Sequence, residues 1–311
     1  LTMMLITDLK KLKHLIWVIA LSIGYFSVKG GVFTLLTGGS FRVWGPSGTF
    51  IEDNNALAVA VLMTIPLMIF LYQSHEAKWI KNGLLFAIIT SLFTVFGSQS
   101  RGAFLALIAV ALFYWTKSKH KFLSALFIIS LSSLIYAFLP ESWFSRMDTI
   151  ETYEEDGSAM GRLNAWEYAF NVANDNFFGL GFESWSSVTF AIYAPNPLDV
   201  DAAHSIYFTI LADHGWGGLV LYLLVFFGAW RALSDIIMRT KGNKSLNDHD
   251  NLARMLQVSM LAYLVGGAFL SLSYFDLPWH LVSFVVLLQK IVSLEQNNGS
   301  VKVKTTLDNL N

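Results

Sequence analysis

The chain has 311 residues, of which 54% are hydrophobic and only 14% are charged. Soluble domains carry about 25% charged residues, so this composition indicates an integral membrane protein. The formal net charge of −1 gives no electrostatic reason to expect nucleic acid as a partner. The chain contains no cysteine, which excludes disulfides, thiolate catalysis and cysteine-ligated metal.

Eight segments approach the length of about 20 apolar residues that a helix needs to cross a bilayer. Their apolar runs are continuous and lack period-two alternation, which favours helices over a barrel. The predicted fold is therefore an all-α bundle of about eight transmembrane helices. The predicted spans are Leu15–Leu36, Ala56–Tyr72, Gly83–Gly97, Gly102–Trp115, Phe122–Leu139, Trp216–Leu233, Leu256–Phe275 and Leu277–Leu294.

Lysine and arginine residues predict the orientation of this bundle. Basic clusters precede the first predicted span and follow the second, fourth and sixth. The positive-inside rule makes these connections cytoplasmic, so both ends of the chain are expected in the cytoplasm. The clusters are Lys10–Lys13, Lys78–Lys81, Lys117–Lys121 and Arg239–Lys244.

The predicted spans divide the chain into four parts. Residues 1–139 hold spans one to five, and residues 216–294 hold spans six to eight. Between them, residues 140–215 form one long polar segment on the non-cytoplasmic side. Residues 295–311 form a polar tail that we expect to be disordered. Because the chain begins with Leu and shows no cleavable signal peptide, we expect part of the natural N-terminus to be absent.

Within the long polar segment, apolar residues recur at three- and four-residue steps. This spacing predicts an amphipathic helix that lies on the outer membrane surface or caps the bundle. Long connections are usually either functional or disordered, and the high aromatic content here argues against disorder. The apolar stripe consists of Leu163, Trp166, Phe170, Ala173 and Phe177.

Arg101 follows the third predicted span and is expected near the outer membrane boundary. One interpretation is a snorkelling side chain that anchors a tight turn. The other is a site for a lipid-linked phosphate, because a planar guanidinium suits phosphate oxygens. The neighbouring donors Ser98, Gln99 and Ser100 favour the phosphate site.

Three further cations are candidates for anion binding on the same side. Arg162 opens the amphipathic helix, where a cation opposes the helix dipole and a bound anion would relieve the misfit. A surface salt bridge to a glutamate within residues 151–155 is the alternative. Lys29 and Arg42 bracket the first outer connection, and each is either a further phosphate contact or a snorkelling side chain.

His204 precedes Ser205–Asp213, a segment that we expect to be helical. Histidine is the side chain whose ordinary pKa suits acid–base chemistry near neutral pH, and a solvated loop histidine is the alternative. His214 is interpreted as the start of a span. The sequence has no metal-binding, P-loop or dinucleotide motif, so we expect no cofactor and no metal.

Six groups of residues then occur in order along the chain: Val28–Phe33, Val43–Pro46 with Asp53–Asn55, Ser98–Ala103, Gly161–Arg162 with Trp166, Gly179–Gly181, and Ala203–Tyr207 with Gly215 and Gly218. Together they resemble the O-antigen ligase and polymerase superfamily of bacterial membrane glycosyltransferases. Within it, the chain is most similar to the O-glycosylation ligases found beside exosortase A.

The resemblance implies a metal-independent, inverting transfer of a glycan from undecaprenyl diphosphate to an acceptor hydroxyl. The reaction would occur at the periplasmic face of the bacterial inner membrane, and the acceptor would be a lipid, a protein or a polysaccharide. By position, Arg101 and Arg162 would hold the donor diphosphate, and His204 would deprotonate the acceptor. Lys29 and Arg42 are weaker candidates for the diphosphate.

Two other functions stay open from the sequence. A polysaccharide polymerase would use the same chemistry with a second lipid-linked chain as acceptor. A transporter or flippase of lipid-linked sugars would need charged residues along a path through the bundle. The predicted spans hold almost none between their ends, which favours the enzyme. Residues 140–215 would then form the upper half of a cavity whose floor is the ends of the spans.

Overall fold

The computed structural model describes residues 2–117, 121–123, 125–126, 129–130, 133, 157–182 and 184–308. Over these ranges the chain forms helices joined by turns and loops, and it contains no strand. The helices are α1 (Thr2–Leu5), α2 (Leu9–Leu36), α3 (Asn54–Ser74), α4 (Lys78–Gly97), α5 (Arg101–Lys117), α8 (Gly157–Asp175), α9 (Ser187–Tyr193), α10 (Ile206–Thr240), η1 (Lys244–Leu246), α11 (Asn247–Gly266), η2 (Gly267–Phe269) and α12 (Asp276–Asp308).

Six helices in the described part of the chain are long and apolar enough to cross a membrane. They are α2, α3, α4, α10, the α11 segment with its flanking turns, and α12. Six of the predicted spans fall on them. The predicted span Gly102–Trp115 falls on α5, whose 17 residues extend about 26 Å, short of the roughly 30 Å hydrocarbon core. The predicted span Phe122–Leu139 lies mostly outside the described residues, so the prediction of eight spans is not confirmed.

Helix α3 lies at the centre of the bundle and packs against α2, α4, α5 and α11. Its most apolar 18-residue stretch is 83% buried, as expected for a helix that is hydrophobic on every side. A hydroxyl also joins it to its neighbour, since Ser259 donates a hydrogen bond to the Met63 carbonyl at 2.7 Å. The continuous apolar run that predicted this span is therefore buried mainly among other helices.

Helices α2 and α4 approach closely through small residues. A Cβ added at Gly31 would overlap the carbonyl oxygen of Thr90. The hydroxyls of Ser27 and Ser91 lie 2.7 Å apart, and the Thr94 hydroxyl donates to the Ser27 carbonyl. Small residues let membrane helices approach, and their hydroxyls link the backbones. The glycines beside Lys29 are therefore packing residues of this interface.

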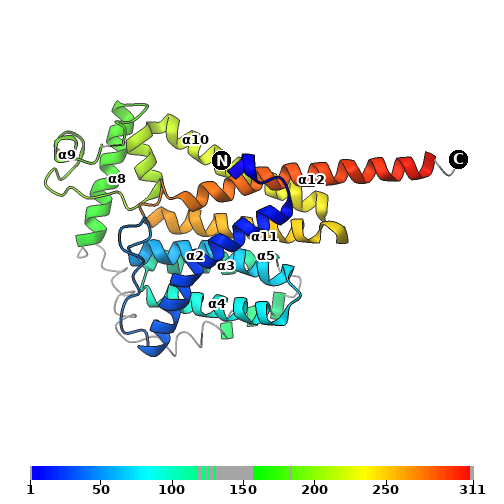
Figure 1. Ribbon diagram of the computed structural model, residues 1–311. Helices are drawn as coiled ribbons and strands as arrows, with labels where there is room; N and C mark the ends of the chain where they lie inside the picture. Colours follow the sequence, from blue (N-terminus) through cyan, green and yellow to red (C-terminus); the bar gives the residue numbers. More distant parts are fainter. Residues whose placement is uncertain are drawn as a thin grey trace.

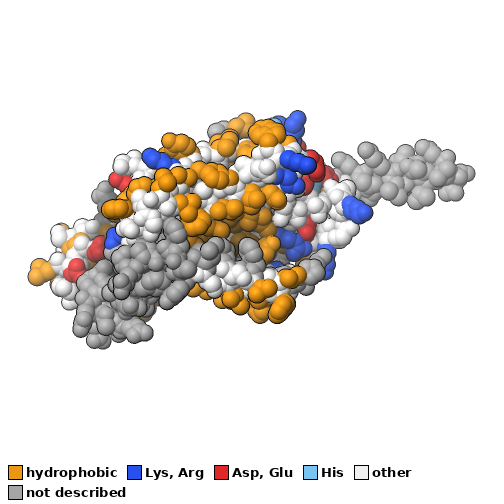
Figure 2. All heavy atoms as spheres, turned by 90° about the horizontal axis from the view of Figure 1, so that it is seen from below, with side chains coloured by type: hydrophobic (Ala, Val, Ile, Leu, Met, Phe, Trp, Pro, Cys, Tyr) orange, Lys and Arg blue, Asp and Glu red, His pale blue; other side chains and the backbone are white. Residues whose placement is uncertain are grey.

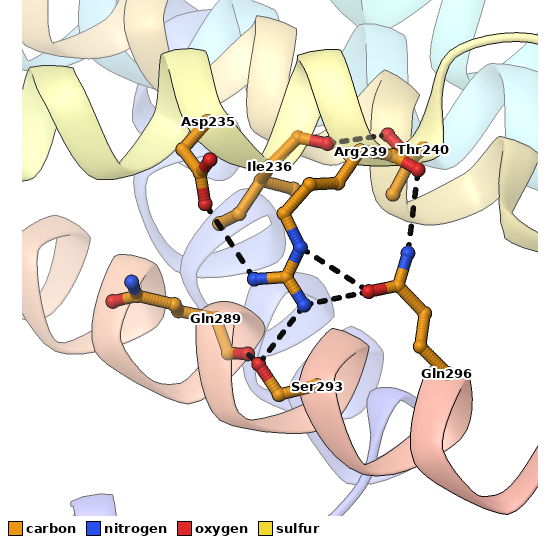
Figure 3. Close-up of polar contacts among 7 residues, drawn as sticks. All are labelled: Asp235, Ile236, Arg239, Thr240, Gln289, Ser293 and Gln296. Atoms are coloured by element: carbon orange, nitrogen blue, oxygen red, sulfur yellow. Dashed lines mark hydrogen bonds and ion pairs between the residues drawn. The ribbon is translucent and has the colours of Figure 1, made fainter.

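One end of the bundle carries the basic clusters, and we call it the basic end. Lys13 of α2 pairs with Asp248 of α11 at 2.6 Å. At the end of α10, the Arg239 guanidinium donates to Gln296 and Ser293 of α12 at 2.6 and 3.2 Å (Figure 3). On the face shown in Figure 2, an apolar surface covers much of the helices, and Lys and Arg gather toward its right-hand end. This is the distribution that the positive-inside pattern predicts.

Helices α8 and α9 lie together at the opposite end of the molecule, away from the C-terminus (Figure 1). Helix α10 begins beside α8 and then breaks at Gly215, where φ is +64° and ψ is −166°. Glycine reaches this conformation without steric cost, and a side chain there would also overlap the Phe177 carbonyl. Residues 206–214 thus form a separate short helix, and the membrane helix begins at Trp216, as the predicted span does.

The predicted amphipathic helix exists as α8, and the predicted apolar stripe divides between buried Ala173 and side chains that are exposed on the protein. Leu163, Phe170 and Phe177 are 42%, 46% and 59% exposed. The buried face instead centres on Tyr168, whose ring stacks on Phe190 of α9 at 4.1 Å. This buried face packs both on α9 and on the short helix at the start of α10.

Substituting Gly31 by alanine is expected to destabilise the bundle, because the added methyl must push α4 away from α2. Overpacking of this kind typically costs about 1–3 kcal/mol. Gly83→Ala is the matched control, since a Cβ there meets nothing within 4 Å. The midpoint of thermal unfolding of the detergent-purified protein should fall by several degrees only for Gly31→Ala. Equal midpoints for the two variants would contradict this packing role.

Candidate active site

His204 lies in the last turn before α10 and has a strained backbone. Its φ of +44° is in the left-handed region, which costs a non-glycine residue about 1–2 kcal/mol. Trp166 of α8 contacts a residue before His204 and a residue after it. Its indole donates to the Ala203 carbonyl at 2.7 Å, and its ring stacks on Phe208 at 4.8 Å. Strain that the surroundings enforce in this way is typical of functional sites.

The imidazole of His204 faces a carboxylate. Its Nε2 atom lies 3.6 Å from Oδ1 of Asp201, and the two side chains are 39% and 45% exposed. A protonated imidazole would form an ion pair with this carboxylate, and partial exposure leaves the ring open to a ligand. His204, the predicted candidate, therefore has the Asp201 carboxylate beside it as a counter-charge for its protonated form.

The same loop places two acids against α8 next to Arg162. A Cβ added at Gly161 would lie 3.5 Å from an oxygen of Asp199 and from an oxygen of Asp201. The loop is held there by Asn164, whose amide donates to the Asp199 carbonyl at 2.9 Å. Arg162 and His204 therefore flank one acidic loop. The glutamates proposed as alternative partners of Arg162 lie outside the described residues.

Arg101 is the first residue of α5, directly after a buried turn. The Ser98 hydroxyl donates to the Val95 carbonyl at 2.6 Å, and the Ser100 hydroxyl accepts from the Ala103 amide at 3.2 Å. Gln99 donates to the backbone of the first outer connection. All three side chains are buried, and Ser98 and Gln99 donate within the protein, whereas the Ser100 hydroxyl accepts.

The short helix η2 joins the Arg101 turn to the His204 turn. A Cβ added at Gly102, beside Arg101, would lie 3.1 Å from Cβ of Phe269. At the other end of η2, a Cβ added at Gly267 would lie 2.7 Å from the side chain of Ile206. The start of α5, which carries Arg101, and the start of α10, which follows His204, therefore both pack on η2.

Lys29 and Arg42 line a cavity of about 280 Å³, which we call the Lys29–Arg42 cavity. Aromatic residues, including Trp44, form part of its wall. The loop that carries Arg42 is tied to the end of α4, because the Val43 amide donates to the Gly97 carbonyl at 2.9 Å. The cavity therefore adjoins the turn that leads to Arg101.

Asp213 is the buried acid of the site, and its side chain was given no role from the sequence. It is 2% exposed. One carboxylate oxygen accepts from the Ser184 hydroxyl at 2.8 Å and from the Trp185 indole at 3.1 Å. The other accepts from the Tyr274 hydroxyl at 2.6 Å. A buried carboxylate needs such donors to offset its desolvation.

Tyr274 extends this network to a second histidine. Its hydroxyl lies 3.1 Å from Nε2 of His214. Burial, together with the hydrogen bond to the Asp213 carboxylate, raises the pKa of Tyr274 above its usual value. The phenol therefore remains a proton donor to Asp213 over the physiological range. His214, interpreted from the sequence as the start of a span, belongs to a polar network at the α10 break.

The sequence contains one signal that points to this network. Asp213 interrupts an otherwise apolar helical pattern just before a glycine, and an acid in such a place requires partners. Its partners come from loops about 29 and 61 residues away in the chain. No local pattern identifies Ser184, Trp185 or Tyr274 as those partners.

The region that contains these segments also matches a known family. Residues 86–223 match the family model of O-antigen ligase. The match includes Arg101, Arg162 and His204, while the Lys29–Arg42 cavity lies before it. Together with the apolar helices, it supports the O-antigen ligase superfamily and indicates a membrane enzyme of the ligase or polymerase type. No curated protein matches the chain.

Replacing Asp213 by asparagine is expected to lower both stability and activity. The amide nitrogen cannot accept, so at least one of the three donors loses its partner, and a hydrogen bond to a charged group contributes about 1.5–3 kcal/mol. Asp175→Asn is the control, because Asp175 ends α8 on the exposed surface. Thermal unfolding should shift only for Asp213→Asn. An unchanged midpoint would show that the network does not hold the α10 break.

Proposed function

We propose that this protein is a membrane glycosyltransferase of the O-antigen ligase type. It transfers a glycan from undecaprenyl diphosphate to an acceptor hydroxyl at the periplasmic face of the bacterial inner membrane. The observation that carries this proposal is a convergence within the matched region. Arg101, Arg162 and the strained His204 lie on segments that meet at the end of the bundle opposite the basic end.

His204 is the proposed general base. With Nε2 facing Asp201, Nδ1 is the nitrogen left to take the proton from the acceptor hydroxyl. The acceptor oxygen then forms a bond to the anomeric carbon, and the bond from that carbon to the diphosphate oxygen breaks with its electron pair. Attack opposite the leaving group inverts the anomeric centre. Asp201 stabilises the imidazolium that results, and general-base assistance contributes about 10²–10⁴-fold in rate.

Arg101 and Arg162 are the proposed contacts of the leaving diphosphate. Negative charge builds on its oxygens as the glycosidic bond breaks, and fixed cations stabilise that charge without reorganisation. Guanidinium groups match phosphate oxygens in a bidentate manner. Within the described residues, no group of three or more His, Cys, Asp or Glu is placed to hold a metal. We assign the stabilisation to the arginines and propose the metal-independent reaction that the resemblance implies.

Two alternatives to a ligase are distinguished by different observations. A polymerase differs only in its acceptor, so the same residues serve either reaction. A transporter or flippase needs ionisable groups along a path through the bundle. In the part of the chain that the structure describes, the buried side chains among Asp, Glu, Lys, Arg and His are Asp213 and His249. Both lie near helix ends, and this distribution supports an enzyme.

The proposal is tested by glycan transfer from a purified undecaprenyl-diphosphate donor, measured in the presence of EDTA. His204→Ala and Arg162→Ala are each expected to lower the transfer rate by about 10²-fold or more. His14→Ala at the basic end is the control and should retain full activity. Unimpaired transfer by His204→Ala would refute the assignment of the base. Complete loss of wild-type activity in EDTA would refute the metal-free reaction.

The proposed orientation is tested by cysteine labelling, because the chain contains no cysteine. Ser187→Cys places a thiol on the exposed start of α9, and Lys244→Cys places one on the exposed basic end. In intact cells with a permeabilised outer membrane, an impermeant maleimide should label only Ser187→Cys. Labelling of Lys244→Cys alone would invert the topology.

A further inference from the structure

An apolar groove of about 1000 Å³ runs along α2 and α4 on the outside of the bundle. Helix α3 contributes its floor through Met68. Trp17 and Trp79 line one end of the groove, and Lys29 lines the other. Lys29 also lines the Lys29–Arg42 cavity, so the groove and the cavity meet at this one side chain.

The groove is long compared with one leaflet of a bilayer. Trp17 and Lys29 are 12 residues apart on α2, which is about 18 Å of helix at about 1.5 Å per residue. Half of a hydrocarbon core is only about 15 Å. Lys29 is also seven residues, or about 10 Å, before the end of α2. With the end of α2 placed at the outer membrane surface, as the sequence predicts, the groove begins below that surface and continues past the middle of the membrane.

A cation at the depth of Lys29 is costly without a counter-charge. The cost of a lysine in a membrane helix is highest at the bilayer centre and falls toward the surface, and Lys29 lies about 10 Å before the end of α2. Over the described ranges, no carboxylate lies within ion-pair distance of Lys29 or Arg42. These two cations are the charged residues that line the Lys29–Arg42 cavity. An anionic ligand would supply the negative charge that pairs with these two cations.

We propose that the α2–α4 groove binds the polyprenyl chain of the carrier lipid, with its phosphate between Lys29 and Arg42. This inference rests on the proposed function. An outer-leaflet phospholipid keeps its phosphate at the membrane surface and its chains within one leaflet, so it fits neither the depth of Lys29 nor the length of the groove. A single polyprenyl chain can lie along the whole groove. Its phosphate then faces the turn that leads to Arg101.

Gly83 provides a way to block the groove without disturbing the fold. It lines the groove, and a Cβ there meets nothing within 4 Å. Gly228 on α10 is a matched control, because it is an exposed glycine of a membrane helix outside the groove, and a Cβ there also meets nothing within 4 Å. Gly83→Phe fills the groove, whereas Gly228→Phe adds the same ring to a different lipid-facing surface.

Binding is measured by native mass spectrometry of the full chain with added undecaprenyl phosphate, which carries no glycan. Lys29→Met is expected to weaken binding about tenfold or more, the scale of one lost charge-assisted contact. Gly83→Phe is expected to weaken it by a similar factor, because the ring occupies the space of the chain. Lys29→Arg and Gly228→Phe should bind as the wild type does. Phosphatidylglycerol at equal mole fraction should not displace the probe.

Equal binding by Gly83→Phe and Gly228→Phe would overturn the groove as the site of the chain. Displacement by phosphatidylglycerol would make it a phospholipid site and would also overturn the proposal. His204→Ala separates this inference from the proposed function, because it should bind undecaprenyl phosphate normally while losing transfer. Normal transfer by that variant would refute His204 as the general base. The binding measurements would still test the groove independently.

Discussion

The carboxylate of Asp213 joins three segments that are far apart in the sequence. It accepts hydrogen bonds from the loop before α9 and from the loop before α12, and it belongs to the short helix that follows His204. Because a buried carboxylate is stable only while its donors stay in place, the three segments are fixed relative to one another. The break at Gly215 allows this short helix to leave the direction of the membrane helix and pack on α8. The position of His204 over the end of the bundle depends on both features.

Much of the fold follows from local sequence patterns. Continuous apolar runs identified six helices that are able to cross a membrane, and the basic clusters gather toward one end as the positive-inside rule requires. The helix after His204 and the restart of α10 at Trp216 were also predicted. These features depend on composition and on residues close in the chain. The fifth predicted span, Phe122–Leu139, was not testable in the same way, because it falls mostly outside the described residues.

The site was less predictable, because its geometry comes from contacts between distant segments. Sequence spacing showed that α8 is amphipathic, but the face that packs on protein depends on contacts with α9 and α10, among them the stacking of Tyr168 on Phe190. Ser98 was expected to donate to a ligand, although its hydroxyl donates within the tight turn. Arg101 and His204 were predicted separately, and it is η2, an element with no sequence signal of its own, that links their turns.

The groove along α2 and α4 opens sideways into the hydrocarbon and not into water. If the carrier lipid reaches the protein by this path, encounters occur by diffusion in the plane of the membrane. The relevant concentration is then the mole fraction of carrier among the lipids. Diluting a suspension of vesicles would leave the turnover of each protein molecule unchanged, while adding inert lipid to the same vesicles would lower it. The enzyme would respond to the composition of its membrane and not to the volume around it.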